Sequence, residues 1–509
     1  MMEGGREISA QPVFPDGANG SPAAAPRLIW TRMIADTETP VSALMKLTEA
    51  GRGDFLLESV EGGAIRGRYS LIGLAPDLIF RANGGNAEIN ADWQQNREAF
   101  IPCAGDTLTE LRKLIAGCRL DIPEELPPAL ALLVGNMGYE TIALVENLPV
   151  PANDAIGVPD MTFVRPTLLL VFDRLKDELF IVAPVWDGDS AAEAVAQERI
   201  DDAAARLSRP LPAARPNVRD LPSELPSPQA VLPQDRYRQM VGKAKDYIAA
   251  GDIFQVVLAQ RFTMDFPLPP FDLYRALRRI NPSPFLYYLD LPDFCLIGSS
   301  PEILVRARDG EVTIRPIAGT RPRGRTALED AANRDSLLAD PKERAEHLML
   351  LDLGRNDVGR VAAPGTVKVT ESYTVEMYSH VMHIVSNVRG DLDPAHDAID
   401  AILAGFPAGT VSGAPKVRAC EIIAELEPEK RGPYAGGVGY FSPDGSMDSC
   451  IVLRTALIKD GVMHMQAGAG IVADSDPAYE QRECEAKSGA LIAAAREALA
   501  RAAEAGYGQ

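Results

Sequence analysis

Four glutamates, arranged as two pairs, have the types and the spacing of a metal site. Glu343 and Glu346 stand three residues apart in DPKERAEHLMLLDLGRND, and Glu480 and Glu483 repeat that spacing in YEQRECEAKSGAL. Residues three apart on a helix share a face, so each pair would present two carboxylates together. Two such helices could jointly hold a hard divalent cation, with Mg²⁺ the first choice. Each helix taken alone is more simply a solvated face with i,i+4 ion pairs.

A second group of residues could bind an anion. Gly468, Ala469 and Gly470 in QAGAGIV lack bulk, so their backbone N–H groups could approach a ligand, although close strand packing explains them equally. Arg454 lies in the apolar run SCIVLRTAL, which would bury its stem. We therefore expect its guanidinium to have a fixed carboxylate partner, from the protein or from a ligand.

Composition limits the class of protein. Of 509 residues, 71 are acidic and 51 are basic, which gives a formal charge of −20. Such a chain is a poor match for nucleic acid or for an anionic membrane, so neither is an expected partner. An anionic substrate must be attracted locally, by arginines, backbone amides or a metal. Six dispersed cysteines, the lack of an apolar stretch near the ~20 residues of a membrane span, and an N-terminus unlike a signal peptide predict a cytoplasmic protein.

The elements that must position these residues fall into two halves. We expect a flexible tail at 1–26, a first half at 27–205, an extended proline-rich connector at 206–233 and a second half at 234–505. The second half mixes strand-like runs ending in glycine with long helices, for example a helix, a Gly251 turn and a strand across RYRQMVGKAKDYIAAGDIFQVVLAQ. This mixture predicts an α+β fold class, a large composite of stacked, mainly antiparallel β-sheets with helices on the outside.

Two finer expectations follow from the same patterns. On the first glutamate helix, His347 should share the carboxylate face, while Leu348 and Leu351 should lie on the packing side. The run CIVLRTALI should form one strand, with Arg454 inside it.

Taken in order, these segments resemble the chorismate-utilising enzymes and, within them, the component I family of anthranilate synthases. The motifs that carry the resemblance are GSSPE, PIAGTRPRG, EHLMLLDLGRND, VMHIVS, FPAGTVSGAPK, GGVGYF, CIVLRT, QAGAGIV and E-x-x-E-x-x-x-K. They cover residues 235–490, and FLLES, GRYSLIG and GNMGYE extend the resemblance into the first half. It implies Mg²⁺-dependent conversion of chorismate and ammonia to anthranilate and pyruvate, the first step of tryptophan biosynthesis.

Two positions separate this family from its neighbours. Family members that add water have a lysine base where this chain has Gln255, and a glutamine cannot deprotonate water. The aminodeoxychorismate branch reads PIKGT and uses that lysine as a covalent nucleophile, whereas this chain has Ala318 in PIAGT. Both departures indicate that ammonia adds directly.

The resemblance also implies roles for individual residues. Glu346 and Glu483 would ligate Mg²⁺ at the ring carboxylate of chorismate, with Glu343 and Glu480 supporting them. Glu302 in GSSPE would protonate the departing 4-hydroxyl, a role that needs a raised pKa.

Further roles concern the later step and the binding of substrate. His383 in VMHIVS would assist the loss of pyruvate. The enolpyruvyl carboxylate would be held by Tyr434, Arg454 and the backbone amides of Gly468, Ala469 and Gly470. Gly319 and Thr320 would contact the ring side, and Lys416 would face the site.

A second ligand site is implied for L-tryptophan as feedback inhibitor. Glu58 and Ser59 of FLLES, with Pro284, Phe285 and Leu286 of NPSPFLYY, match the family's tryptophan-binding elements. The family often has Tyr and Met where Phe285 and Leu286 stand, a change that keeps an apolar pocket. Both segments could instead only pack the interface between the two halves.

No glutaminase segment is evident, because no glycine-flanked nucleophilic cysteine precedes a His/Glu pair. Ammonia would come from solution or from a separate glutamine amidotransferase subunit, component II, in a heterotetramer. Two enzymatic alternatives are an aminodeoxychorismate synthase component I, disfavoured by Ala318, and an isochorismate- or salicylate-forming enzyme, disfavoured by Gln255. A non-catalytic paralogue that binds chorismate or tryptophan should have lost Glu302, Glu346 or Glu483, and all three are present.

Overall fold

The computed structural model describes residues 25–61, 65–128, 130–186, 190–212, 221–378 and 381–504. Most of the predicted tail and the middle of the predicted connector fall outside these ranges.

Two antiparallel β-sheets, each of twelve strands within the described ranges, form the body of the molecule. The first sheet has the order β1 (Arg27–Ile34), β10 (Glu178–Val185), β9 (Leu168–Asp173), β3 (Ile65–Leu74), β2 (Phe55–Glu61), β13 (Phe285–Leu291), β14 (Phe294–Ser300), β23 (Thr455–Lys459), β24 (Val462–Ile471), β12 (Gln255–Asp265) and β11 (Gln229–Ala230), with β20 (Gly413–Ala414) beside β12.

The second sheet has the order β17 (Ile317–Pro322), β19 (Val381–Asp391), β16 (Glu311–Ile314), β15 (Ile303–Arg308), β22 (Met447–Ile451), β21 (Gly437–Phe441), β7 (Leu133–Met137), β8 (Met161–Arg165), β4 (Leu78–Asn83), β5 (Asn86–Asn90) and β6 (Ile101–Pro102), with β18 (Lys368–Met377) beside β19.

The helices lie outside these sheets. They are α1 (Pro40–Leu47), α2 (Thr107–Gly117), α3 (Ser190–Leu207), α4 (Gln234–Ala250), α5 (Pro270–Ile280), α6 (Ala327–Ala339), α7 (Pro341–Gly359), α8 (Ala398–Ala404), α9 (Lys416–Leu426) and α10 (Pro477–Ala503), with the 3₁₀ helices η1 (Tyr139–Leu144) and η3 (Gly409–Val411). None of the helices in the described ranges is both long and apolar enough to cross a membrane.

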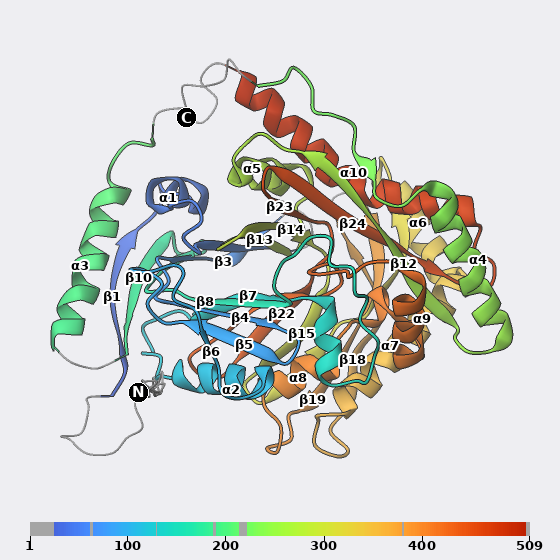
Figure 1. The fold of residues 1–509 in the computed structure, drawn as a ribbon, viewed down its shortest axis with the longest axis horizontal. Helices are drawn as coiled ribbons and strands as arrows, with labels where there is room; N and C mark the ends of the chain where they lie inside the picture. Colours follow the sequence, from blue (N-terminus) through green and yellow to red (C-terminus); the bar gives the residue numbers. More distant parts are fainter. Residues whose placement is uncertain are drawn as a thin grey trace, which may run out of the picture.

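Apolar side chains separate the layers. Between the sheets, Leu71 and Tyr287 of the first sheet belong to the same buried cluster as Val134 and Val164 of the second. Helices α1, α3, α5 and α10 share another cluster with the outer face of the first sheet, and α2, α7 and α8 share a third with the second sheet. Figure 1 shows α5 and α10 above the stacked sheets and α2 and α8 below them. The predicted α+β fold of stacked antiparallel sheets with outer helices is confirmed.

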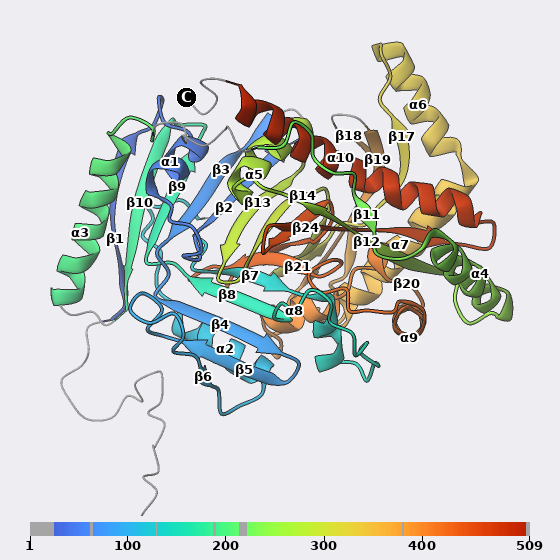
Figure 2. The same cartoon turned by 45° about the horizontal axis from the view of Figure 1, so that its top comes forward.

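Both predicted halves contribute strands to both sheets. Strand β2 pairs with β13, with Glu58 opposite Leu286, and β7 pairs with β21, with Met137 opposite Gly437. Figure 2 shows β1 and α3 at one end of the molecule and α4, α6, α7 and α9 at the other. Because the halves interlock, the boundaries drawn between them from the sequence stay a prediction.

The two glutamate helices begin in the same way. Asp340 caps α7 and accepts the backbone N–H groups of Lys342 and Glu343, and Asp476 caps α10 and accepts that of Tyr479. A proline follows each cap, at the first helical position, where its missing N–H costs nothing. Glu343 and Glu480 therefore stand in the first turn of their helices, where the helix dipole favours a negative charge.

Two of the finer expectations were wrong. The run CIVLRTALI is not one strand, since Arg454 has a φ of +47° and divides it into β22 in the second sheet and β23 in the first. On α7, Leu351 is buried as expected, but Leu348 is 50 % exposed, and the fully buried side chain is that of His347. The imidazole is held inside by a 2.7 Å hydrogen bond between its Nε2 and the Ser386 hydroxyl.

Candidate functional site

Glu302 and Arg454 lie where the chain passes between the sheets. Glu302 stands between β14 of the first sheet and β15 of the second, and Arg454 stands between β22 and β23. The two crossings are hydrogen-bonded to each other: the Ile451 N–H donates to the Glu302 carbonyl (3.0 Å), and the Ser299 N–H donates to the Arg454 carbonyl (3.2 Å). The passage of the chain from one sheet to the other thus brings together Glu302 and Arg454, a carboxyl group and a guanidinium that are about 150 residues apart in the sequence.

The Glu302 side chain is held in its acid form. It is 7 % exposed, and the Thr410 hydroxyl of η3 donates to its Oε1 (3.2 Å). Burial raises the pKa of Glu302 to about 8, although the Thr410 hydrogen bond and the charge of Arg454 both lower it. At neutral pH this carboxyl group is therefore mainly protonated and can donate a proton.

Arg454 forms no ion pair with an acidic side chain of the described residues. Its guanidinium interacts electrostatically with Tyr378 and Glu302, and burial lowers its pKa. Among the residues that the structure describes, no carboxylate lies within 4 Å of it, although most other arginines of the interior have one. A partly buried cation without a protein anion is a site for a ligand carboxylate.

His383 is a buried neutral base near Arg454, whose charge also lowers its pKa. Its Nδ1 lies 3.1 Å from the Gly319 carbonyl oxygen and 3.1 Å from the Thr320 hydroxyl, its neighbour across the β17–β19 pair. Because a carbonyl can only accept, Nδ1 carries the ring hydrogen and Nε2 keeps its lone pair. Burial lowers the pKa of His383 to about 4, so the ring is neutral at physiological pH.

Gln255 joins α7 to the glycine strand. Its amide Nε2 donates to Glu346 Oε1 (3.3 Å), and a Cβ at Gly470 would overlap this amide group. Gln255 Oε1 is buried and has no hydrogen-bond partner among the described residues. Glycine at position 470 is therefore what allows Gln255 to lie between the first glutamate helix and β24.

The second glutamate helix reaches the same strand through Lys487. The ammonium group of Lys487 donates to the Gly468 carbonyl (2.8 Å) and is paired with Glu483 (2.8 Å). The buried Tyr434 hydroxyl also lies against Gly468, where it would be only 2.8 Å from a Cβ. Gly468 thus contacts both Tyr434 and Lys487, and the glycine run is in register with β12, where Gly470 pairs with Val257.

The four glutamates fit a hard divalent ion by their chemistry. Burial raises the pKa of Glu346 and of Glu480, and in each case the neighbouring glutamate, Glu343 or Glu483, raises it further. Lys487 of α10 also acts on Glu346 of α7, so the two pairs share one electrostatic environment. A divalent cation would relieve this repulsion. Within the described residues no three acidic, histidine or cysteine side chains already surround one point, so the ligand set stays a prediction.

Lys416 has a contact that the sequence did not predict. It forms a buried ion pair with Asp357 of α7, with 2.9 Å between Nζ and Oδ2, and thereby ties the start of α9 to that helix. This contact is structural. A role for Lys416 toward a substrate stays a prediction.

The residues predicted to bind tryptophan do lie together, but Glu58 is already engaged. Leu286 and Glu58 face each other across the β2–β13 pair. The Glu58 carboxylate accepts from the Tyr274 hydroxyl (2.6 Å), from Arg278 (2.8 and 2.9 Å) and from Arg174. Burial alone would raise the pKa of Glu58, but Arg278, Tyr274 and Arg174 together lower it. A ligand that bound the Glu58 carboxylate would therefore have to displace internal partners.

Sequence reasoning missed several residues that support the site. Thr410 was hidden in the glycine-rich run FPAGTVSGAPK, where only a hydroxyl among small residues signals it. Lys487 was seen in the E-x-x-E-x-x-x-K motif but received no role. Tyr378, whose ring meets that of His383 edge-on at 5.4 Å, gave no sequence signal at all.

Comparison with known proteins places this geometry in context. The family described as chorismate binding enzyme matches residues 58–493. The chain is 52 % identical to anthranilate synthase component 1 of Cereibacter sphaeroides, over 97 % of this chain and 99 % of that protein. It is 46 % identical to the protein of the same name from Thermus thermophilus, over 91 % of this chain and 96 % of the other.

Solved structures give the same result for the fold. The crystal structure of anthranilate synthase component I from Streptococcus pneumoniae has a TM-score of 0.75 and 36 % identity, covering 91 % of this chain and 99 % of that one. The menaquinone-specific isochorismate synthase of Escherichia coli shares the fold at a TM-score of 0.68 with only 21 % identity, covering 93 % and 95 % of the two chains.

Proposed function

Because the chain belongs to the chorismate-binding enzymes, and to the anthranilate synthase component 1 proteins among them, we propose that it converts chorismate and ammonia to anthranilate and pyruvate. The observation that carries this proposal is the pairing of a protonated Glu302 with Arg454, a guanidinium that has no carboxylate partner among the described residues. Chorismate offers what both groups lack, a leaving hydroxyl and a carboxylate.

Because the chain is acidic, the anionic substrate would be bound by two sources of positive charge, an arginine with backbone amides and a metal ion. Arg454, the Tyr434 hydroxyl and the backbone of Gly468–Gly470 would hold the enolpyruvyl carboxylate. Glu346 and Glu483, supported by Glu343 and Glu480, would hold Mg²⁺. When bound, the ion would supply positive charge to the ring carboxylate and offset the repulsion between that carboxylate and the glutamates.

The proton steps follow from the two buried titratable groups. Glu302 donates its proton to the 4-hydroxyl, which leaves as water while ammonia bonds to the conjugated ring carbon. His383, neutral with a free Nε2, is available to accept the ring proton as pyruvate departs and the ring becomes aromatic. Over the whole reaction chorismate and ammonia give anthranilate, pyruvate and water, with no net proton gained or lost.

Two side chains support ammonia as the nucleophile. Gln255 contacts Glu346 and cannot act as a base for water, and its unpaired Oε1 is a hydrogen-bond acceptor suited to an N–H group. Ala318 on β17 has no amine with which to attack the ring. Ammonia would be supplied by a separate glutamine amidotransferase subunit or from solution.

The test is a direct assay. The purified chain is incubated with chorismate, Mg²⁺ and ammonium salt, and the products are separated and identified by fluorescence and mass. Anthranilate and pyruvate in equal amounts are expected, and both should disappear when Mg²⁺ is removed by a chelator. Isochorismate or aminodeoxychorismate as the main product would refute the proposal.

A further inference from the structure

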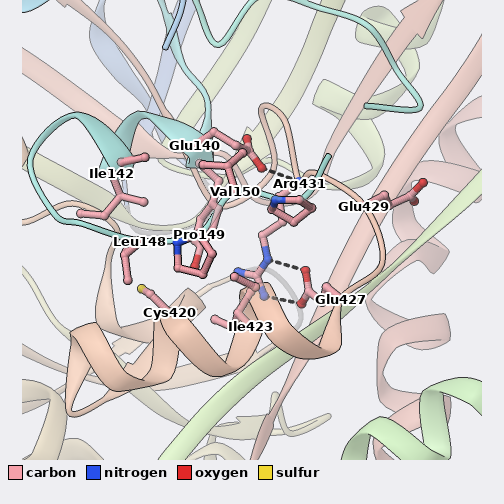
Figure 3. Close-up of a pocket in the computed structure, with 14 residues that line it drawn as sticks. Glu140, Ile142, Leu148, Pro149, Val150, Cys420, Ile423, Glu427, Glu429 and Arg431 are labelled. Carbon is pink, nitrogen blue, oxygen red and sulfur yellow. Dashed lines mark hydrogen bonds and ion pairs between the residues drawn. The ribbon is translucent and has the colours of Figure 1, made fainter. Parts of the chain in front are cut away.

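The GNMGYE motif of the first half has no place in the proposed chemistry, yet it touches the turn that carries Tyr434. Glu140 in η1 accepts the backbone N–H groups of Arg431 (2.8 Å) and Gly432 (3.0 Å), one on each carboxylate oxygen. In return, the Tyr139 N–H donates to the Gly432 carbonyl (2.8 Å). Figure 3 shows Glu140 reaching across to Arg431 from a segment nearly three hundred residues earlier in the chain.

Arg431 extends this contact into the second half. Its side chain is 1 % exposed and forms a two-pronged ion pair with Glu427 (2.8 and 2.6 Å), which Figure 3 also shows. Its Nη1 donates to the Val411 carbonyl, and its Nη2, which also binds Glu427, donates to the Val257 carbonyl, each at 2.8 Å. The guanidinium also lies over the rings of Tyr139 (4.6 Å) and Tyr434 (5.7 Å). Its charge and most of its hydrogen-bond donors are thus satisfied within the protein.

Each segment that Arg431 holds carries a residue of the proposed site. Val257 follows Gln255 by two positions on β12, Val411 follows Thr410, the donor to Glu302, and Tyr434 is in the Arg431 turn itself. A buried guanidinium whose charge and most of whose donors are satisfied fixes the segments that it binds in one arrangement. A displacement of Arg431 would therefore shift residues of the proposed substrate site.

We propose that Glu140 and Arg431 are positioning residues, through which the first half of the chain sets the place of Tyr434 in the chorismate site. The inference rests on the proposed function, because it takes Tyr434 as a substrate-binding residue. Glu140 has two acceptor oxygens for two consecutive N–H groups, a requirement that glutamine cannot meet, since its NH₂ group would face one of the donors. Burial raises the pKa of Glu140 to about 7, which means that its buried position disfavours the charged carboxylate.

The first experiment compares Glu140→Gln with Asp54→Asn by steady-state kinetics. Asp54 is a matched control: it is also a buried carboxylate of the first half, it accepts the N–H groups of Ala75 (2.9 Å) and Glu49 (3.2 Å), and it has no contact with Tyr434. Glu140→Gln should raise the KM for chorismate about tenfold and change kcat less than about twofold. Asp54→Asn should lower the Tm without changing the KM. Equal KM values for the two variants would overturn the inference.

The second experiment separates positioning from a general loss of stability. If Glu140 acts through Tyr434, the double variant Glu140→Gln/Tyr434→Phe should have the KM of Tyr434→Phe alone. Arg431→Lys, which keeps the charge but loses the fork, should be partly non-additive with Tyr434→Phe, because it also loosens the Val411 and Val257 segments, and it serves if Glu140→Gln does not fold. Additive effects would overturn the inference and leave the proposed function intact. A wild-type KM in Tyr434→Phe would instead remove the substrate role of Tyr434, and the inference with it.

Discussion

Arg454 and Glu58 were each expected to contribute to a ligand site, but among the described residues the protein provides a counter-charge only for Glu58. Glu58 is bound by Arg278, Arg174 and the Tyr274 hydroxyl, which satisfy both carboxylate oxygens. Arg454 has no carboxylate within reach among the described residues and interacts only electrostatically with Glu302 and Tyr378. The charge of Glu58 is thus balanced within the protein, whereas the charge of Arg454 is not balanced by a carboxylate of the described residues.

This difference separates a binding group from a structural one. Leaving a charge partly buried without a counter-charge is costly, so its persistence at Arg454 points to a substrate that completes the site. At Glu58 the same physics points to a joint between β2 and α5, because removing the carboxylate would leave two arginines without an anion. A ligand at the second region would then rely on other groups, such as Ser59 and the apolar Phe285.

The largest expected effect is on the acid of the incomplete site. Glu302→Gln removes the proton donor but keeps the shape, so kcat should fall about 10²- to 10⁴-fold while chorismate still binds. The measurement is kcat with ammonium salt, together with chorismate affinity by calorimetry. A variant that retained more than about a tenth of the activity would show that Glu302 is not the acid.

The pKa of Glu302 gives this prediction a pH signature. Because its pKa is raised to about 8, the acid form predominates below that pH and is lost above it, so kcat should fall on the alkaline side near pH 8. Thr410 stabilises the carboxylate form through its hydrogen bond, and Thr410→Val should move the alkaline limb to higher pH. Profiles are compared at a fixed concentration of free ammonia. An unmoved limb would separate Thr410 from the titrating group.

The next effect is on the metal. Glu483→Gln removes a proposed ligand, and about 100-fold more Mg²⁺ should be needed for half-maximal activity, with the Tm unchanged. Glu485 on the same helix is exposed and is a suitable control, so Glu485→Gln should need no extra Mg²⁺. Mg²⁺ titrations of turnover and of binding heat measure both variants. Full activity of Glu483→Gln at limiting Mg²⁺ would remove Glu483 from the ligand set.

The parts of the fold that follow local rules were predictable from the sequence. The helix, the Gly251 turn and the strand after it are present as α4, a glycine with a φ of +85°, and β12. The two glutamate helices were also predicted, because glutamate spacing is a local signal. What could not be read was the division of CIVLRTALI at Arg454, since apolar residues on both sides suit strands in either sheet and nothing marks the positive φ.

For the site, the sequence supplied only candidate residues, whose roles stay predictions. The resemblance supplied Glu302, His383 and Arg454, but their proximity depends on two sheet crossings that no periodicity encodes. The partners of Glu58 come from the turn after β9 and from α5, both more than a hundred residues later in the chain. A sequence gives the charge of such a group, whereas its state depends on long-range contacts.

The prediction for Arg454 tests the comparison directly. Arg454→Ala should raise the KM for chorismate about 10- to 100-fold, the loss expected for hydrogen bonds to a charged group, and Arg454→Lys should lie between it and the wild type because it keeps the charge but not the fork. Steady-state kinetics at saturating ammonia measures both. If Arg454→Ala binds chorismate like the wild type, Arg454 does not bind a substrate carboxylate, and it does not differ from Glu58 in being a ligand-binding group.

The smallest effect on uninhibited turnover, and the sharpest test of the second region, is expected at Ser59. Its backbone lies at an irregularity in the β2–β3 register, and a Cβ at Gly67 would overlap its hydroxyl, so a bulky residue at position 59 would press on β3. Ser59→Ala would remove the expected hydrogen bond between the Ser59 hydroxyl and tryptophan without adding volume. It should weaken inhibition by tryptophan about fivefold, and kcat without tryptophan should stay unchanged within about twofold. Ser59→Phe should abolish inhibition but also lower the Tm.

Tryptophan titrations with ammonia as donor measure both Ser59 variants, and chorismate affinity is measured with and without tryptophan. Suppose that tryptophan binds the less active arrangement of the two interlocked halves. The factor by which tryptophan weakens chorismate binding must then equal the factor by which chorismate weakens tryptophan binding. If tryptophan instead competed with chorismate at Arg454, the factor would have no upper limit, because saturating chorismate would exclude tryptophan completely. A wild type that ignores millimolar tryptophan, or a Ser59→Ala variant that responds like the wild type, would leave Glu58 and its neighbours as a structural joint alone.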